Sequence, residues 1–140
     1  PPRSTLSPSS AASDVYKRQD IWDVGVAGAP VVDWEEMYAL SDAMFRRFIE
    51  ILFAGKRDLW GERSPITYVE NVRAPLCIIQ PQNDTRTPLK PVLKYIQRLM
   101  ENEKTFEVHI IPDMGHAITK VEDAMKIVYP AIIFLKKYFG

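Results

Sequence analysis

Asp84 and His116 are the two residues of this 140-residue chain that are best placed for acid–base chemistry. Each lies in a loop that follows a short apolar segment predicting a β-strand, at 76–80 and at 106–111. A histidine can take a proton from a nucleophile and return it to the leaving group, while a carboxylate orients the ring and stabilises its charged form. A single Asp or His in a loop is usually structural. The pair, each following a strand, favours two members of a nucleophilic triad.

The segments around these loops alternate between strand and helix patterns. A helix is predicted from Pro88, and a longer one runs to the C-terminus. Their predicted core faces are Val92, Leu93, Ile96, Leu99 and Met100 in the first helix, and Val121, Ala124, Met125, Val128, Ile132, Leu135 and Phe139 in the second. Strand–helix–strand order requires parallel strands, whose carboxyl ends carry the reactive loops. Acid before histidine is the chain order of α/β-hydrolases. We therefore predict an α/β fold with a mostly parallel sheet and flanking helices.

The upstream segments predict a further strand and several shorter helices. Residues 23–29 predict a buried strand, and Asp33 with Glu36 three residues later indicates a helix start. Ser41 is expected to begin or renew a helix, and Ser64 before Pro65 to cap a short helix that reaches about residue 72. The segment 56–63 is predicted as an exposed turn, Gly55 as a helix stop, and Gly115 as the residue that lets the backbone turn sharply before His116. One apolar helical face is expected from Met44, Phe45, Phe48, Ile49 and Leu52.

The composition excludes several classes of protein. Eighteen basic residues balance eighteen acidic ones, which argues against a nucleic-acid partner. One cysteine allows no internal disulfide and no cysteine-rich metal cage. No apolar run reaches the roughly 18 residues of a membrane span, and no secretory signal is recognisable. We expect a cytoplasmic protein with no metal and no cofactor. Residues 1–19, rich in Ser and Pro, are expected to be a disordered or foreign leader, with the domain at 20–140.

Other reactive residues have plainer interpretations. Cys77 lies inside a predicted strand and not at a strand–helix turn, so we expect a core residue. His109 also lies in a strand, and its spacing to His116 is not that of a metal site, so we expect a structural histidine. Ser41 and Ser64 are better interpreted as helix caps than as nucleophiles.

Four segments of the sequence carry a resemblance to a known family: VAGAPVVDW, ERSPI, APLCIIQPQNDTRTP and FEVHIIPDMGHAI. Over about 118 residues the chain resembles the end of the catalytic domain of acylaminoacyl-peptidases, in the prolyl oligopeptidase family of serine peptidases. The resemblance implies an α/β-hydrolase fold, of which this chain is expected to be the C-terminal half, with a β-propeller before it in complete members. It implies that Asp84 is the triad acid and His116 the triad histidine. A carboxylate oxygen of Asp84 is then expected within about 2.6–3.2 Å of His116 Nδ1.

The sequence departs from the family at the nucleophile. The family's serine sits in a G-x-S-x-G-G elbow about twenty residues before the VAGAP strand, which would fall near Thr5. The residues there are PRSTLSPSS, without a glycine, and no G-x-S-x-G occurs in the chain. One oxyanion-hole donor follows that serine, and the other comes from a still earlier loop. We therefore expect a fragment that is inactive alone. Another α/β-hydrolase of the esterase or dienelactone hydrolase type, or a non-catalytic α/β interaction module, stays open.

The resemblance also implies a substrate site. Trp34, Phe45, Phe48 and Ile49 are expected to line a pocket for a hydrophobic side chain, although the bland interpretation of this face is core. Arg86 is expected to face the polar end of the substrate or to be a solvated loop charge. The expected partner is a peptide whose N-terminal acyl-amino acid is released. The oligomeric state of the complete enzyme stays open, with a homo-oligomer as one option. The fragment itself is expected to self-associate through faces that missing strands would cover.

Overall fold

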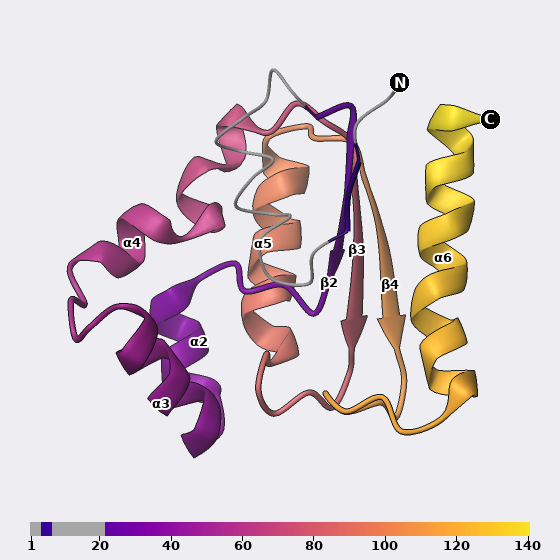
Figure 1. Cartoon of the computed structure of the whole chain (residues 1–140). Coiled ribbons are helices and arrows are strands. Elements are labelled where there is room, and N and C mark those ends of the chain that lie inside the picture. Colours follow the sequence, from indigo (N-terminus) through magenta and orange to yellow (C-terminus); the bar gives the residue numbers. More distant parts are fainter. Residues whose placement is uncertain (1–3, 7–21) are drawn as a thin grey trace.

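A parallel four-stranded sheet lies at the centre of the computed structural model, which describes residues 4–6 and 22–140 (Figure 1). The sheet order follows the chain order: β1 (Ser4–Leu6), β2 (Val24–Gly28), β3 (Leu76–Pro81) and β4 (Phe106–Ile111). Each neighbouring pair is parallel, so the connections from β2 to β3 and from β3 to β4 cross over the sheet. The predicted α/β class and parallel sheet are confirmed, and β2, β3 and β4 match the predicted strands within one residue at each end.

Strand β3 is the core of the sheet because its six residues are all buried. Alternate side chains point to opposite faces. Leu76 and Ile78 pack in the cluster under α5 (Leu89–Glu101), with Val92 and Leu99. Cys77 and Ile79 pack in the cluster under α6 (Val121–Phe139). Helices therefore cover both faces of the sheet, α5 on one side and α6 on the other (Figure 1).

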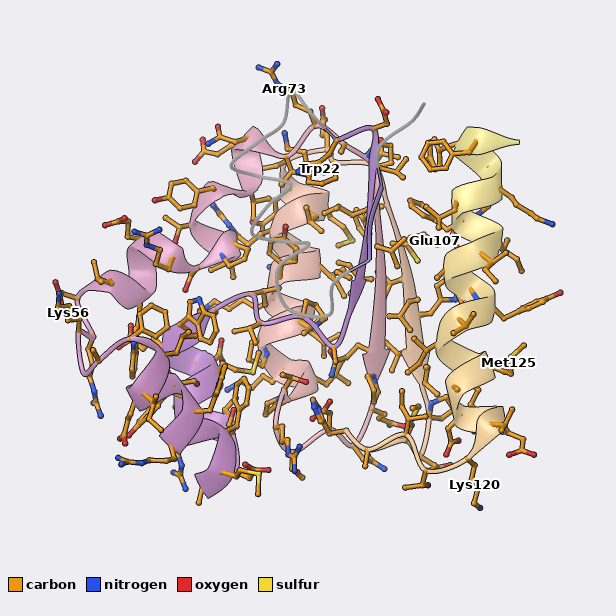
Figure 2. All side chains as sticks on the ribbon, viewed as in Figure 1. Trp22, Lys56, Arg73, Glu107, Lys120 and Met125 are labelled. Carbon is orange, nitrogen blue, oxygen red and sulfur yellow. The ribbon has the colours of Figure 1, made fainter. Side chains whose placement is uncertain are left out.

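The predicted core faces of the two long helices are only partly right. In α5, Val92 and Leu99 are buried as predicted, but Leu93 and Met100 are exposed. In α6 the buried residues are Ala131 and Phe134, with Ile127, Leu135 and Phe139 packed beside them. Four residues of the predicted α6 face are exposed instead: Val121, Met125, Val128 and Ile132. Helix α6 has apolar residues on more than one side, so its sequence did not single out the side that contacts the sheet. Figure 2 shows Met125 on the side away from the sheet.

Short helices between β2 and β3 form a third apolar cluster beside the sheet. Helix α2 (Trp34–Leu40) begins as predicted, because the Asp33 carboxylate accepts hydrogen bonds from the backbone N–H groups of Glu35 and Glu36. Helices α3 (Ala43–Leu52) and α4 (Leu59–Arg63) and the 3-10 helix η1 (Pro65–Asn71) follow. The cluster contains Val31, Trp34, Met37, Ile49 and Trp60. The segment at 56–63 is therefore not wholly exposed, since Trp60 is buried.

The structure corrects the predicted role of Ser41 and confirms Ser64 at the N-cap position of a short helix that starts with Pro65. Ser41 ends α2, and Asp42 caps α3 by accepting from the N–H of Phe45. Ser64 precedes η1, but its hydroxyl makes no cap there. It donates to the carbonyl of Trp60 and accepts from the N–H of Trp34, which ties the end of α4 to the start of α2. Ser64 thus joins two helices through one hydroxyl, a contact that local sequence does not reveal.

Strand β1 was not expected from the sequence. The backbone of Ser4–Leu6 pairs in parallel with Val24, Gly25 and Val26 of β2, within the segment that the sequence analysis set apart as a leader. The rest of that predicted leader lies outside the described residues. Among the residues that the structure describes, no helix is both long and apolar enough to cross a membrane.

Candidate active site

The loops after β3 and β4 bring Asp84 and His116 into direct contact. Asp84 Oδ2 lies 2.8 Å from His116 Nδ1, as the sequence predicted for a triad pair. The Asp84 side chain is fully buried, while the His116 ring is about one-third exposed, at 36%. With Nδ1 turned to the carboxylate, Nε2 is the ring nitrogen that can take a proton from another molecule.

Three further donors fix the Asp84 carboxylate. Oδ1 accepts from the backbone N–H groups of Arg86, at 2.9 Å, and Thr87, at 2.8 Å. Oδ2 accepts from the Thr87 hydroxyl at 2.8 Å, in addition to its contact with His116. An aspartate that accepts from the N–H groups two and three residues ahead forms an Asx turn, which its sequence favours. The turn and the hydroxyl give this carboxylate one orientation.

Backbone hydrogen bonds join the two site loops to each other. The N–H of Gln82 donates to the carbonyl of Ile111, and that of Asn83 donates to the carbonyl of Met114, both at 2.9 Å. Met114 is buried in the cluster under α6, which anchors the histidine loop. The sharp turn before His116 occurs at Asp113, whose φ is 56°, and Gly115 has no positive φ. The predicted role of Gly115 is thus wrong: Asp113, a residue type that tolerates the left-handed region, makes the turn.

Two residues that sequence analysis did not assign to the site hold the aspartate loop from behind. Gln80 is fully buried, and its Nε2 donates to the carbonyls of Thr87, at 2.8 Å, and Pro81, at 3.0 Å. The hydroxyl of Ser41 lies 2.6 Å from the carbonyl of Arg86. The signal for Gln80 was a polar residue at the end of an otherwise apolar strand. Ser41 is 45 residues from its partner in the chain, and no local pattern marks it.

The predicted substrate residues divide between core and surface. Trp34, Phe45 and Ile49 belong to one apolar cluster, in which Ile49 is fully buried and Phe45 partly so. Phe48 is 49% exposed and stacks on Phe45, with 5.5 Å between ring centroids. The predicted α3 face is mostly solvent-facing, because Met44 and Leu52 are exposed as well. The role of these residues in substrate binding stays a prediction.

A hollow of about 440 Å³ lies beside this cluster and is lined by Trp34, Leu52 and Phe53 among others. Arg86 forms a 3.7 Å ion pair with Asp42, the cap of α3. The N–H of Asp42 also donates to the carbonyl of Thr85 at 2.9 Å. The start of α3 is therefore attached to the loop that carries Asp84, and Phe45 lies one helical turn from that attachment.

The geometry can perform one half of nucleophilic catalysis. A buried, hydrogen-bonded carboxylate orients an accessible imidazole, which is the acid–histidine pair of a triad. The serines of residues 22–140 are Ser41 and Ser64, and both hydroxyls donate to backbone carbonyls. The hydrogen bonds of both hydroxyls go to backbone groups and not to His116, so residues 22–140 present the base and its carboxylate but not an activated serine.

Comparison with known proteins shows which proteins the chain is similar to. The acylamino-acid-releasing enzyme of Homo sapiens is 27% identical over 124 residues, which are 82% of this chain and 17% of that protein. A solved acylaminoacyl peptidase in complex with Z-Gly-Gly-Phe-chloromethyl ketone superposes with a TM-score of 0.77 at 22% identity, covering 91% of this chain and 22% of that one. A puromycin hydrolase superposes with a TM-score of 0.71 at 17% identity, covering 90% of this chain and 21% of that one. The chain thus spans less than a quarter of the length of these relatives.

The match to a family extends over nearly the whole chain, from residue 10 to residue 140. It includes part of the segment before residue 20, where the resemblance noted from the sequence began to fade. It also covers both site loops and all the helices described above. The chain belongs to the prolyl oligopeptidase family.

Proposed function

We propose that Asp84 and His116 are the acid and the histidine of a serine-peptidase triad, in a protein that releases N-acylated amino acids from blocked peptides. The observation that carries the proposal is the 2.8 Å contact between Asp84 Oδ2 and His116 Nδ1. The similarity to the human acylamino-acid-releasing enzyme supports the substrate class. The puromycin hydrolase has the same fold, so the fold alone does not select the substrate.

In the proposed reaction His116 Nε2 takes the proton of a serine hydroxyl as the oxygen attacks the carbonyl of the scissile amide. The C–N bond then breaks, and His116 returns that proton to the departing amine, which leaves an acyl-enzyme ester. Water, deprotonated by the same nitrogen, hydrolyses the ester and restores the serine. Asp84 keeps Nδ1 of the ring protonated and stabilises the imidazolium between these steps. The donors from Arg86 and Thr87 keep Asp84 from turning away as the ring becomes charged.

The proposed specificity is for a hydrophobic side chain on the released residue. Phe48 offers apolar surface on α3, the helix whose start is attached to the loop of Asp84, and the hollow beside Trp34 lies by the end of that helix. The ligand of the solved acylaminoacyl peptidase ends in phenylalanine chloromethyl ketone, which supports an aromatic side chain here. Burial of such a side chain contributes roughly 25 cal/mol per Å² of apolar surface. Arg86 is proposed to face the polar end of the substrate.

We also propose that the 140-residue chain is inactive by itself. The position expected for the nucleophile, near Thr5, lies in a stretch without glycine, and no G-x-S-x-G is present. A base without a positioned nucleophile or oxyanion donors leaves at most a residual rate. The proposed partners are a peptide substrate for the complete enzyme and further copies of the chain for the fragment. A cytoplasmic location is proposed as well, in keeping with a lone cysteine and no internal disulfide.

A serine-directed fluorophosphonate probe tests the proposal directly. We expect no labelling of the chain and no hydrolysis of acyl-amino-acid nitroanilides above a buffer blank. When the preceding part of the hydrolase domain of the human relative, with its serine elbow, replaces residues 1–19, labelling should appear. In that protein His116→Ala should abolish labelling and Asp84→Asn should lower kcat by orders of magnitude. Labelling of the unaltered chain at one of its own serines would refute the proposed inactivity.

A substrate panel on the completed protein separates the remaining alternatives. Hydrolysis of acyl-amino-acid nitroanilides well above that of simple esters supports the peptidase. A preference for simple esters or lactones would identify the esterase or dienelactone hydrolase type. Absence of all hydrolysis in a folded, completed protein would leave the non-catalytic module.

A further inference from the structure

We propose that Cys77, Glu107 and His109 form a binding site for a divalent transition-metal ion of the zinc type. Their ligand atoms all lie within 4.8 Å of one another. The site is on the face of the sheet covered by α6 and shares no residue with the Asp84–His116 pair. It goes beyond the proposed peptidase function and does not depend on it.

The strand register places these three side chains together. Cys77 of β3 is the direct partner of Glu107 in the parallel ladder, and His109 follows Glu107 by two residues on β4. Residues two apart on a strand point to the same face. Cys77 packs in the cluster under α6, which fixes that face as the one beneath the helix. Figure 2 shows Glu107 between the sheet and α6. Two hydrogen-bonded strands thus hold a sulfur, an oxygen and a nitrogen ligand.

The ligand types and their spacing suit a tetrahedral ion. Zinc binds cysteine sulfur at about 2.3 Å and histidine nitrogen or carboxylate oxygen at about 2.0–2.2 Å, so the ligand atoms end up roughly 3.5 Å apart. Glu107 Oε1 and His109 Nε2 are now 2.7 Å apart, and no pair in the cluster exceeds 4.8 Å. Side-chain rotations that move these ligand atoms by about 1 Å would form the site. Thiolate and imidazole together favour zinc-type ions over magnesium or calcium, and water can fill the fourth position.

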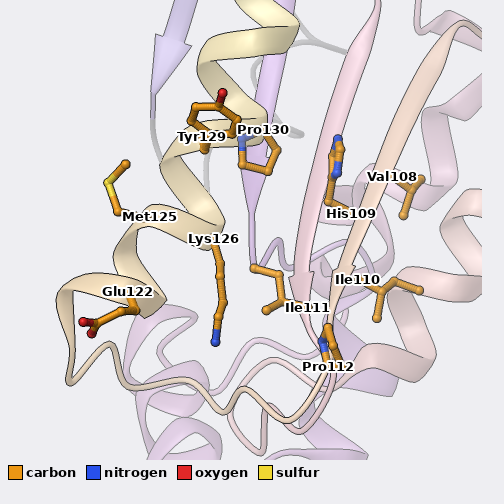
Figure 3. A pocket seen from close by; sticks show the side chains of 10 residues that line it. All are labelled: Val108, His109, Ile110, Ile111, Pro112, Glu122, Met125, Lys126, Tyr129 and Pro130. Atoms are coloured by element: carbon orange, nitrogen blue, oxygen red, sulfur yellow. The ribbon is translucent and has the colours of Figure 1, made fainter.

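One of the three ligands, His109, is reached from a groove. His109 lines a hollow of about 740 Å³ between β4 and the first turns of α6 (Figure 3). Lys126 extends into the same hollow from α6 (Figure 3). The side chains of His109 and Glu107 are partly exposed, at 34% and 27%, whereas Cys77 is buried beneath them. An ion would therefore meet the imidazole and the carboxylate first and the sulfur last.

Lys137 competes with the metal for Glu107. Its ammonium group on α6 forms an ion pair with Glu107 Oε2. The lysine side chain is half exposed, so it can turn into water when a metal arrives. On binding, the Cys77 thiol loses its proton to solvent and the sulfur forms the metal–thiolate bond. The lysine thus weakens the site without blocking it.

Cobalt(II) titration of the 140-residue chain tests the proposal with a signal specific to one residue. The chain has a single cysteine, so a thiolate-to-cobalt charge-transfer band can arise only from Cys77. We expect the band to saturate at one ion per chain and to disappear when zinc is added. No band in the folded chain would overturn the proposal. One ion per two chains would overturn it as well, because the site would then lie between copies.

Matched variants decide whether all three residues bind the ion. His109→Gln and Glu107→Gln alter partly exposed side chains and should each weaken cobalt binding by roughly 10-fold or more. Lys137→Gln should strengthen it several-fold by removing the competitor. His116→Gln, which changes the other histidine, should leave the affinity unchanged. Circular dichroism checks that each variant is folded. The test does not need a substitution of Cys77, which is buried and whose loss could unfold the chain. A band that His109→Gln leaves unchanged would refute the three-residue site.

Discussion

Asp84 holds His116 with the same carboxylate oxygen, Oδ2, that accepts the hydroxyl of Thr87. The other oxygen takes the two backbone N–H groups of the Asx turn. In all four contacts the partner lies within hydrogen-bonding distance of the carboxylate oxygens, so both oxygens are held in place. The loop that carries Asp84 therefore fixes the orientation of the carboxylate, and His116 bonds to an acceptor that is already oriented.

Thr87→Val should lower the stability of the chain while keeping the shape of the side chain. The substitution removes the hydroxyl that donates to buried Asp84 Oδ2. A hydrogen bond to a charged group contributes about 1.5–3 kcal/mol, so we expect a loss of that size in the free energy of unfolding, measured by urea denaturation. In the completed enzyme the same variant should lower kcat with little change in KM, since Thr87 positions Asp84 and does not touch substrate.

Thr85→Val is the matched control for this prediction. Thr85 lies in the same loop, but its side chain is exposed. Loss of the Thr85 hydroxyl should change the free energy of unfolding by less than about 0.5 kcal/mol. Equal effects of the two substitutions would show that the Thr87 hydroxyl does not stabilise Asp84.

The two histidines should carry their protons on opposite ring nitrogens when both rings are neutral. His116 presents Nδ1 to Asp84, and His109 presents Nε2 to Glu107. A carboxylate accepts a hydrogen bond from the protonated nitrogen, so His116 should be the Nδ1–H tautomer and His109 the Nε2–H tautomer. Nitrogen-15 NMR at alkaline pH distinguishes them. Asp84→Asn should alter the His116 pattern alone, and the same tautomer at both rings would contradict the geometry.

Strand–loop–strand regions were predictable because their signals are local. The apolar runs of β3 and β4 end in loops rich in turn-forming residues, and parallel strands place those loops at one edge. Asp84 and His116 therefore followed from sequence. The side of α6 that contacts the sheet could not be predicted from the sequence, because the exposed Val128 and Ile132 are as apolar as the buried Phe134. Ser41, which reaches across the fold to Arg86, and Asp113, which makes the turn assigned to Gly115, depend on tertiary contacts that no local pattern encodes.

Ile49 and Phe48, neighbours on α3, should respond differently to truncation. Ile49 is fully buried, so Ile49→Ala should lower the free energy of unfolding by about 2–5 kcal/mol. Phe48 is half exposed, and Phe48→Ala should cost less than about 1 kcal/mol. If Phe48 lines the proposed substrate pocket, the same variant should raise KM for phenylalanine substrates of the completed enzyme. An unchanged KM would place Phe48 outside the pocket.

The exposed stripe of α6 should drive self-association of the chain. Val121, Met125, Val128 and Ile132 follow one helical face and are all exposed. Contiguous apolar surface of this kind promotes association. Light scattering at tens of micromolar should detect species larger than the monomer, and Met125→Lys with Ile132→Lys should reduce them. A monodisperse wild-type monomer would contradict the prediction. If the double variant associates as much as wild type, the contact between copies lies on another surface of the chain.

Cys77 should be unreactive in the metal-free folded chain and should make stability fall at high pH. Burial, reinforced by the nearby charge of Glu107 and opposed by Lys137, raises the pKa of the Cys77 thiol to about 12. An unfolded thiol ionises near pH 8.5, so the folded state binds a proton that the unfolded chain loses between these values. The stabilising contribution is therefore complete below about pH 8.5 and is lost as the pH rises toward 12. Iodoacetamide at pH 8 should modify the folded chain orders of magnitude more slowly than the urea-unfolded chain.

The free energy of unfolding, measured from pH 7 to pH 11 for wild type and for Cys77→Ala, isolates this effect. Other groups, Tyr38 among them, also titrate at alkaline pH, but they contribute to both proteins. The advantage of wild type over the variant should shrink above about pH 8.5 by up to about 1.4 kcal/mol per pH unit. A constant difference across the whole range, or fast alkylation of the folded chain, would mean that solvent reaches the sulfur. In that case the ordering of β3 beneath α6 would be looser than its packing against Phe134 indicates.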